Sequence, residues 1–413
     1  MPYGIKVDAM LLKLALRSIF RQRMRTAITL TAIVFGVTGL ILSGGFVQDI
    51  FVQLGEAIIR SETGHIQIFR EGFREQGARQ PDRYLIDDPK KEIARVAALP
   101  LVSGVTARLG FSGLLNNGKR DLAIIGEGIE PDKEAKLGSV LQMVSGRQLA
   151  DSDQFGMMIG QGVAHSLGLS SGDRVTLLIN STGGALNTLD VEIVGIFESF
   201  SKEFDARAVR VSLTDAQELM VTSGANVLVV TLHDTKTTDT ALAEIQELVK
   251  ADPLEALSWK QLSDFYEKTV QLYDRQFGVL QIIILVMVLL SVANTVNMST
   301  FERMGEFGTL QALGNKHRDI FQLILLENVA LGFIGGAIGV AAGVALALVI
   351  SAIGIQMPPP PNANSGYTAM IRLDLVSVLS AFFIGVAATT LAAIFPARRV
   401  SRTPVVEALR QRV

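Results

Sequence analysis

Four long stretches that are nearly free of charged side chains constrain the fold of this chain more than any other feature of its sequence. A helix needs roughly 20 apolar residues to span a membrane, and one charge at its centre costs about 2.5–3.5 kcal/mol on insertion scales. We therefore predict four transmembrane helices, over residues 26–48, 277–299, 320–353 and 375–397. The first could be a signal peptide, but its apolar run exceeds the roughly 7–15 residues of such signals, so we interpret it as an uncleaved anchor.

The segment between the first two spans, residues 49–258, contains no such run and predicts a large soluble domain. Strand-like and helix-like stretches alternate in it, so we expect an α+β membrane protein with a mixed α/β periplasmic domain inserted between transmembrane helices 1 and 2. Its length indicates at least two lobes. Strands are predicted at residues 65–69, 105–109, 121–125, 174–179, 191–197, 208–213 and 226–232. Helices are predicted at 90–98, 162–167, 214–222 and 238–250, the third with Thr214 as its N-cap.

Residues 259–276 predict a helical stalk that leads into the second span. Trp259, Leu262, Tyr266 and Tyr273 recur at helical intervals, and no proline or glycine interrupts the segment. Such spacing is typical of one helix face, so we expect one continuous helix from Trp259 into the membrane. A surface helix packed on its own domain is the alternative.

The distribution of charge predicts the orientation in the membrane. Residues 1–25 carry six basic and one acidic residue, residues 398–413 carry five and one, and residues 48–276 carry 23 basic and 33 acidic residues. Because basic segments stay in the cytoplasm, we expect both termini there, and the large domain and a loop at 354–374 in the periplasm, in a bacterial inner (cytoplasmic) membrane. Lys13, Arg17, Arg21 and Arg25 also indicate a cytoplasmic amphipathic helix over residues 1–25, with a simple basic flank as the alternative. Residues 398–413 form the predicted cytoplasmic tail.

The sequence contains no convincing catalytic, nucleotide or metal site. Residues 113–120 nearly match a phosphate-binding loop, but Arg120 replaces the magnesium-binding hydroxyl and strand-like residues follow. Asn116-Asn117-Gly118 is better interpreted as a hairpin turn. The chain has no cysteine, and its four histidines are scattered. We therefore predict a non-catalytic protein that itself binds no metal, no cofactor and no nucleic acid.

The third span carries one ionisable residue and a run of glycines. No second buried partner for Glu327 is visible in the spans, so we interpret it as a structural hydrogen-bonding residue rather than part of a proton relay. Gly335, Gly339 and Gly343 leave one helix face without side chains, which allows another helix to approach closely. That helix belongs either to the same chain or to a second copy.

The connection between spans two and three, residues 300–319, carries the most specific motif. It resembles the coupling-helix pattern of the FtsX/MacB family of ABC transporter permeases, Arg-xx-Glu-(Ile/Phe)-Gly-x-Leu-x-Ala-(Leu/Ile)-Gly. An acidic first turn, an apolar stripe of Phe307 and Leu310 and a glycine stop predict a compact knob that enters a groove on another protein. The residues that match the pattern are Arg303, Glu306, Phe307, Gly308, Leu310, Ala312, Leu313 and Gly314.

The resemblance extends over nearly the whole chain. Residues 17–26 and 395–410 are similar to the segments that open and close the family's membrane region, and residues 146–149, 158–164 and 167–175 are similar to its periplasmic core motif. Chain length, the strand after the first span and residues 125–131 look most like the LolC and LolE lipoprotein-releasing permeases. MacB differs from them because it carries a fused ATPase.

The resemblance implies a type VII permease that acts with partners. ATP and magnesium would bind to a separate ABC ATPase dimer, whose closure would push the coupling helices. A second permease copy or paralogue would complete a dimer that extracts a lipid-anchored or amphiphilic substrate by mechanotransmission, in some cases with a periplasmic chaperone or adaptor. The alternatives are an FtsX-like signalling protein that activates a periplasmic partner and a MacB-like efflux permease.

We also predict a lateral substrate entry between the first span and the second span of the opposite subunit. Apolar side chains near the outer membrane surface suit acyl chains there. An ordinary lipid-facing or packing surface is the alternative. The residues are Phe46, Val47, Phe51, Phe277, Val279 and Leu280.

Overall fold

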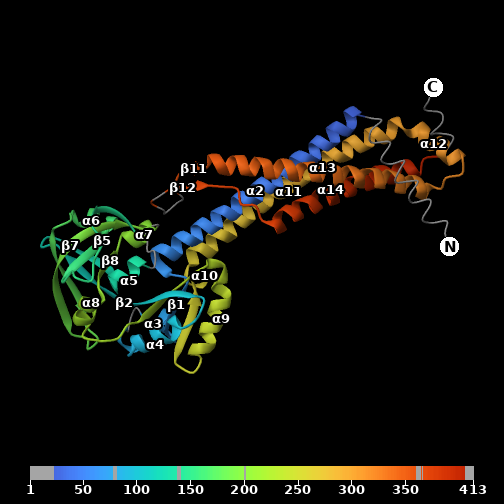
Figure 1. The fold of residues 1–413 in the computed structure, drawn as a ribbon. Helices are drawn as coiled ribbons and strands as arrows, with labels where there is room; N and C mark the ends of the chain where they lie inside the picture. Colours follow the sequence, from blue (N-terminus) through green and yellow to red (C-terminus); the bar gives the residue numbers. More distant parts are fainter. Residues whose placement is uncertain are drawn as a thin grey trace. The chain divides into compact units, whose positions relative to one another are not determined.

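The computed structural model describes residues 23–77, 81–136, 141–199, 201–359, 364 and 366–404 (Figure 1). The chain falls into two compact units, a helical bundle (Met1–Phe51, Val270–Gln356 and Thr368–Val413) and a domain (Val52–Thr269 and Met357–Tyr367). Most of the predicted amphipathic helix and of the predicted tail lies outside the described residues.

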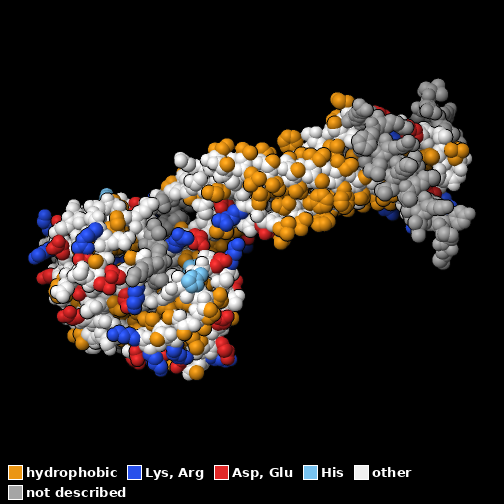
Figure 2. Space-filling model, viewed as in Figure 1, with side chains coloured by type: hydrophobic (Ala, Val, Ile, Leu, Met, Phe, Trp, Pro, Cys, Tyr) orange, Lys and Arg blue, Asp and Glu red, His pale blue; other side chains and the backbone are white. Residues whose placement is uncertain are grey.

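Among the described residues, four helices are long and apolar enough to cross a membrane, as the charge-free stretches predict. They are α2 (Arg23–Ile58), α11 (Asp264–Glu302), α13 (His317–Ile353) and α14 (Leu375–Ser401). Hydrophobic side chains cover much of the bundle surface that is visible in Figure 2, as expected where helices face lipid. The shorter α12 (Met304–Ala312) connects α11 to α13, and the strands β11 (Ile355–Met357) and β12 (Tyr367–Ala369) lie between α13 and α14.

Two of the long helices have ends that differ from the predicted ones. Helix α2 continues ten residues beyond the predicted span and then widens into a π-helix, η1 (Ile59–Thr63). The continuous helix expected from Trp259 is interrupted: α10 (Trp259–Leu262) ends at Ser263, which has extended backbone angles, and α11 starts one residue later. The Trp259 ring holds α10 against α2, because a Cβ on Gly55 would lie only 2.6 Å from its Cη2 atom.

The glycines of α13 pack against α2 of the same chain. Cβ atoms built at Gly335, Gly339 and Gly343 would lie 2.9, 2.8 and 3.0 Å from the side chains of Ile33, Val37 and Ile41, respectively. The Thr38 hydroxyl also donates to the Gly339 carbonyl at 3.1 Å. Of the two helices proposed for this glycine face, the one from the same chain is confirmed.

A second face of α13 packs on α14. Gly332 lies against Thr389, and Gly336 lies against the Phe382 ring. Where the loop after β12 reaches the bundle, Asp49 accepts hydrogen bonds from Met370 N at 2.8 Å and Arg372 Nε at 2.9 Å. The Asp49 side chain is only 2 % exposed, so this ion pair fastens the start of α14 to α2.

The domain is built on one ten-stranded mixed sheet, with most strands in the order β10-β1-β9-β2-β3-β8-β5-β7-β4 and β6 paired with β2 and β7. The strands are β1 (Ile66–Arg70), β2 (Val102–Asn116), β3 (Asp121–Ile129), β4 (Gln142–Gly146), β5 (Gly156–Gly160), β6 (Arg174–Asn180), β7 (Leu186–Glu198), β8 (Ala208–Ser212), β9 (Val227–Leu232) and β10 (Leu254–Ser258). The α-helices are α3 (Phe73–Gln76), α4 (Pro89–Ala97), α5 (Pro131–Lys136), α6 (Gln161–Leu167), α7 (Lys202–Asp205), α8 (Leu213–Met220) and α9 (Thr238–Val249). The described part of the domain also contains two 3-10 helices, η2 (Pro81–Tyr84) and η3 (Thr235–Thr237).

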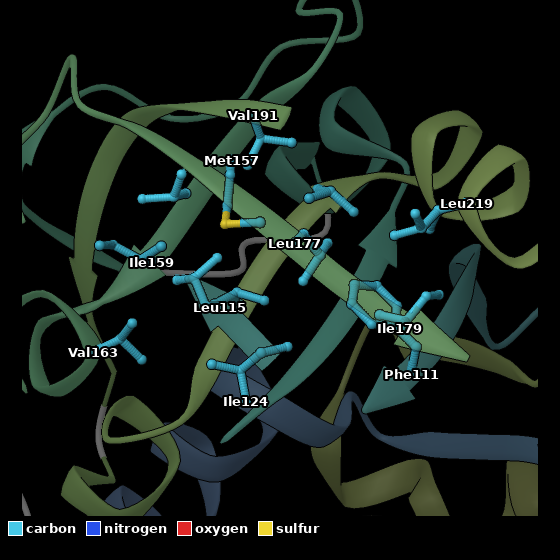
Figure 3. Close-up of a cluster of buried hydrophobic side chains, with 14 of the residues drawn as sticks. Phe111, Leu115, Ile124, Met157, Ile159, Val163, Leu177, Ile179, Val191 and Leu219 are labelled. Carbon is cyan, nitrogen blue, oxygen red and sulfur yellow. The ribbon is translucent and has the colours of Figure 1, made fainter. Parts of the chain in front are cut away.

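Strand β2 belongs to two hydrophobic cores, which correspond to the expected lobes. Its first half pairs with β9 and contributes Val105 and Ala107 to a core with α4 and α9. Its second half pairs with β3 and β6 and contributes Phe111 and Leu115 to a core with α6 and α8 (Figure 3). A strand of 15 residues therefore joins the two lobes within one sheet.

The seven predicted strands and four predicted helices of the domain all occur, and Asn116 pairs with Asp121 across the predicted hairpin. One detail was wrong: Ser212, not Thr214, caps α8, because its hydroxyl accepts from the backbone N–H of Asp215 at 2.9 Å. Strands β4, β5 and β10 were not predicted. They have only five residues each, and β5 begins and ends with glycine, which hides the strand pattern.

We expect Gly339→Val to destabilise the bundle by about 1–3 kcal/mol, because the added side chain overlaps Val37 and approaches the backbone of Val34. Gly278→Val is the matched control, since a Cβ at Gly278 meets no atom within 4 Å. Thermal unfolding of both purified variants in detergent measures the difference. Wild-type stability for Gly339→Val would contradict the close packing of α13 on α2.

Candidate functional site

Helix α12 is the structured part of the predicted coupling motif, and its sequence explains where it starts and stops. Arg303, with φ −95° and ψ 8°, separates it from α11. At its other end, the N–H groups of Gly314 and Asn315 donate to the carbonyls of Gln311 and Leu310 at 3.0 and 3.1 Å. This is a Schellman motif, and Gly314 has the positive φ of 103° that it requires. The predicted glycine stop is confirmed.

Arg303 joins α12 to α13 through a buried ion pair. Its Nη1 atom donates to both carboxylate oxygens of Glu327, at 3.0 and 2.8 Å, and its Nε atom donates to Glu306 at 3.2 Å. The guanidinium also lies 5.1 Å from the centre of the Phe307 ring. Only 8 % of Arg303 is exposed, so the pair is held in one geometry at low dielectric.

This ion pair confirms the structural hydrogen-bonding role predicted for Glu327 and supplies the buried partner that the spans do not contain. The partner lies 24 residues earlier, in the connection between two spans. Glu327 is therefore an ion-pair partner of the coupling segment.

The inward face of α12 corrects one expectation. Phe307 is only 2 % exposed and packs in the bundle core with Val296, Ile320 and Ile324, and Leu310 is partly buried against the same core. The apolar stripe expected to enter a partner's groove thus enters the chain's own bundle. Arg303, Phe307 and Gly308 are all buried and do not present their side chains outward.

The outward face of α12 is small. Ala312 and Gly314 are exposed, Leu313 is 78 % exposed, and the Glu306 side chain is 41 % exposed. Next to this face, Gln311 Nε2 donates to the carbonyl of Ser401 at 3.3 Å, which ties the end of α12 to the end of α14. The structure therefore divides the predicted coupling residues into an anchoring set and an exposed set.

The predicted substrate-entry residues are mostly occupied by packing within the chain. The rings of Phe46 and Phe277 meet edge to face with centres 6.4 Å apart, Phe51 lies 6.4 Å from Tyr273, and Val47 is only 8 % exposed. These four residues therefore take part in packing within the chain. Val279 and Leu280 are 57 % and 44 % exposed and remain available to lipid or a partner.

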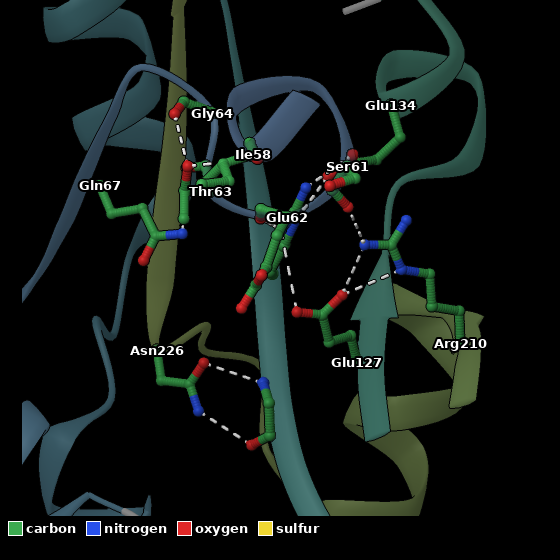
Figure 4. Close-up of polar contacts among 12 residues, drawn as sticks. Ile58, Ser61, Glu62, Thr63, Gly64, Gln67, Glu127, Glu134, Arg210 and Asn226 are labelled. Carbon is green, nitrogen blue, oxygen red and sulfur yellow. Dashed lines mark hydrogen bonds and ion pairs between the residues drawn. The ribbon is translucent and has the colours of Figure 1, made fainter. Parts of the chain in front are cut away.

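Two buried arginines of the domain, which sequence reasoning missed, hold the end of α2 (Figure 4). Arg108 of β2 and Arg210 of β8 donate to the backbone carbonyls of Glu62 and Ser61, both within η1. Arg108 also pairs with Glu134 at 2.6 Å, and Arg210 pairs with Glu127 at 2.9 Å. A charged residue inside an alternating strand was the available signal.

The electrostatics of this cluster keep Arg108 charged. Burial lowers the pKa of Arg108, but the neighbouring carboxylates of Glu134 and Glu127 outweigh burial and raise that pKa above its ordinary value. Arg210 is 1 % exposed and lies about 6 Å from the rings of Phe197 and Phe204. Among the described residues, no group of three or more His, Asp or Glu side chains is arranged to hold a metal ion.

Comparison with known proteins connects these features to a family. Residues 26–248 match the model of the MacB-like periplasmic core domain, and residues 278–405 match that of the FtsX-like permease C-terminal region. An uncharacterized ABC transporter permease of Methanocaldococcus jannaschii is 26% identical and aligns over 98% of this chain and 99% of its own length. The lipoprotein-releasing system transmembrane protein LolC of Neisseria meningitidis is 22% identical, over 93% of this chain and 94% of its own.

A longer relative and a solved structure are also similar. The macrolide export ATP-binding/permease protein MacB of a Shewanella species is 23% identical over 96% of this chain but only 60% of its own length. The crystal structure of the periplasmic region of MacB from Actinobacillus actinomycetemcomitans covers 52% of this chain and 96% of its own, with 14% identity and a TM-score of 0.37, a likeness too low to support an inference. The periplasmic core model matches more than half of the residues, and the FtsX-like model matches the region from α11 to α14. These matches show that the chain belongs to the FtsX/MacB family of ABC transporter permeases, the type VII class.

Proposed function

We propose that this chain is the permease subunit of a transporter that uses ATP hydrolysis on a separate subunit to extract or export a lipid-anchored or amphiphilic substrate by mechanotransmission. The observation that carries the proposal is the construction of α12. One side of it is fixed in the bundle by the Arg303–Glu327 pair and Phe307, and the other side exposes Leu313 and Glu306. A helix that is anchored on one side and exposed on the other can transmit a push from a partner.

The long helices supply a path for that push. Helix α11 has 39 residues, which corresponds to roughly 58 Å at 1.5 Å per residue, and it runs without interruption from Asp264 to the residue before Arg303. Helix α2 likewise begins in the bundle unit and ends in the domain unit. Displacement of α12 would therefore act on the domain through continuous helices.

The proposal implies three kinds of partner. An ABC ATPase dimer, carrying ATP and magnesium, would receive the exposed face of α12, and both termini would lie with it in the cytoplasm of a cell whose inner membrane holds the chain. Only 11% of the most apolar stretch of α11 is buried within the chain. A second permease copy or paralogue would cover the exposed remainder. A periplasmic chaperone or adaptor would accept the substrate.

Lipid-anchored proteins are the substrate class that we favour. Removing a lipid anchor from a bilayer costs about 0.8 kcal/mol per buried CH₂, so it requires an external energy source. The relative LolC, which aligns along nearly its whole length, is named for a lipoprotein-releasing system. A MacB-like efflux permease and an FtsX-like signalling protein are the alternatives, and identifying the molecules that co-purify with the complex would separate them.

We expect Leu313→Asp to weaken binding of the ATPase, because it places a charge at the most exposed apolar side chain of the α12 segment. Glu306→Lys should reduce substrate-stimulated ATP hydrolysis as well. The matched control is Leu373→Asp, an exposed leucine at the α14 start, away from α12. Co-purification of the ATPase and its stimulated rate are the measurements. Unchanged values for both variants would exclude this face as the contact.

The ion pair between Arg303 and Glu327 is tested by a second set of variants. Glu327→Gln removes the more buried of the two carboxylates that face Arg303, so it should destabilise the bundle by about 3–5 kcal/mol in thermal unfolding. The double variant Arg303→Met/Glu327→Leu should recover stability but retain lower stimulated ATP hydrolysis, because apolar contacts fix the angle of α12 less strictly. Full ATPase stimulation in the stable double variant would show that the pair is not needed for transmission.

The expected orientation is tested with reporter enzymes. A reporter that is active only after export should be active when inserted near Gly183 in the domain and inactive when fused after Val413. A reporter that is active only in the cytoplasm should give the opposite result at both positions. Export activity at the C-terminal fusion would overturn the orientation.

A further inference from the structure

A recess of about 320 Å³ lies in the domain, at the place where α2 ends and α11 begins. One wall consists of the last turn of α2 and η1, and another consists of Leu262, Ser263 and Asp264 at the break before α11. Segment 201–207, which includes α7, and Ile125 of β3 complete it. A volume of this size is within the range of small-molecule sites, roughly 300–1,000 Å³.

The charges that line this recess are predominantly negative. Glu62, Glu203 and Asp264 contribute three carboxylates, against the single guanidinium of Arg207. Within the described part of the chain, none of these three carboxylates forms a side-chain hydrogen bond or ion pair. Arg108 and Arg210, which lie behind η1, are already paired with Glu134 and Glu127. The recess therefore favours a cationic occupant over an anionic one.

The backbone directs one of these carboxylates into the recess. Glu62 lies in the π-helix η1, in which Gly64 N donates to Ile59 O at 2.9 Å. Such turns are rare and occur frequently at functional sites. Because Arg108 and Arg210 hold the carbonyls of this turn, the Glu62 side chain is not needed to stabilise it, and it is exposed.

Apolar side chains line the remaining surface. Ile58, Phe204 and Leu262 contribute to the walls, and Ile125 is 53 % exposed, which is high for an isoleucine. The lining therefore combines carboxylates with apolar side chains, which suits an extended occupant that is partly apolar and partly cationic.

We propose that this recess binds an organic cation with an apolar body, that is, an ammonium group carried on an alkyl or aryl portion. Glu62 and Asp264 would face the ammonium group, and Ile125 and Phe204 would contact the apolar portion. Such a ligand would touch the end of α2 and the start of α11 at once. The inference concerns binding to this chain alone and does not depend on the proposed function.

The probe is 4-phenylbutylammonium, titrated calorimetrically into the full-length chain in a neutral detergent, with partition into micelles subtracted. We expect saturable binding of the ammonium, at least tenfold weaker binding of the neutral 4-phenylbutanol and no binding of 4-phenylbutyrate. Glu62→Gln/Asp264→Asn should lower the affinity for the ammonium at least tenfold. Glu244→Gln, an exposed carboxylate on α9 outside the recess, is the matched control and should bind as the wild type does.

A further variant tests the volume of the recess without changing its charge. Ile125→Trp should fill the recess and abolish binding, while its thermal unfolding temperature stays near that of the wild type because residue 125 is exposed. Absence of saturable ammonium binding to the wild type, preference for phenylbutyrate, or unchanged affinity in the charge variant would each overturn the proposal. None of these results would bear on coupling to an ATPase, which is measured separately.

Discussion

The ion pair between Arg303 and Glu327 determines how the bundle is built around α12. Two charges withdrawn from water are both costly, and a guanidinium recovers that cost only when it faces its carboxylate in a suitable geometry. Arg303 is also the residue at which α11 stops, so the pair fixes the turn into α12. Phe307 follows one turn later on the same face and must enter the core, which leaves Leu313 outside.

Packing within the bundle decides which helices move together. The contact of α13 with α2 consists of glycines facing β-branched side chains, which allows little sliding because Ile33, Val37 and Ile41 each sit in a gap left by a missing side chain. The Asp49–Arg372 pair adds the start of α14 to this group. Of the four long helices described, α11 has the smallest buried share of its apolar stretch. It therefore offers the most surface to a partner. In the proposed mechanism, a push on α12 would therefore reach one well-packed group of helices and one more exposed helix.

The sequence was sufficient for features that depend on local composition. Charge-free stretches predicted the four long helices, and β-branched content predicted most strands. The sequence was insufficient for features that depend on which face of a helix is buried. The apolar stripe of Phe307 and Leu310 is compatible with burial against a partner and with burial in the chain's own core. Glu327 lacked a visible partner because Arg303 lies outside the spans, and Arg108 and Arg210 became meaningful only when β2 and β8 brought them to η1.

Buried arginines secure both ends of the proposed path, but in different ways. Arg303 binds side-chain carboxylates, so its contact depends on Glu327 keeping its charge. Arg108 and Arg210 bind backbone carbonyls of η1 as well, and backbone acceptors are present whatever the side chain is. The end of α2 is thus fastened without using the carboxylate of Glu62. In the proposed mechanism, this turn would transmit force through its backbone while its side chain lines the recess. A ligand there would then act on the helix end without loosening it.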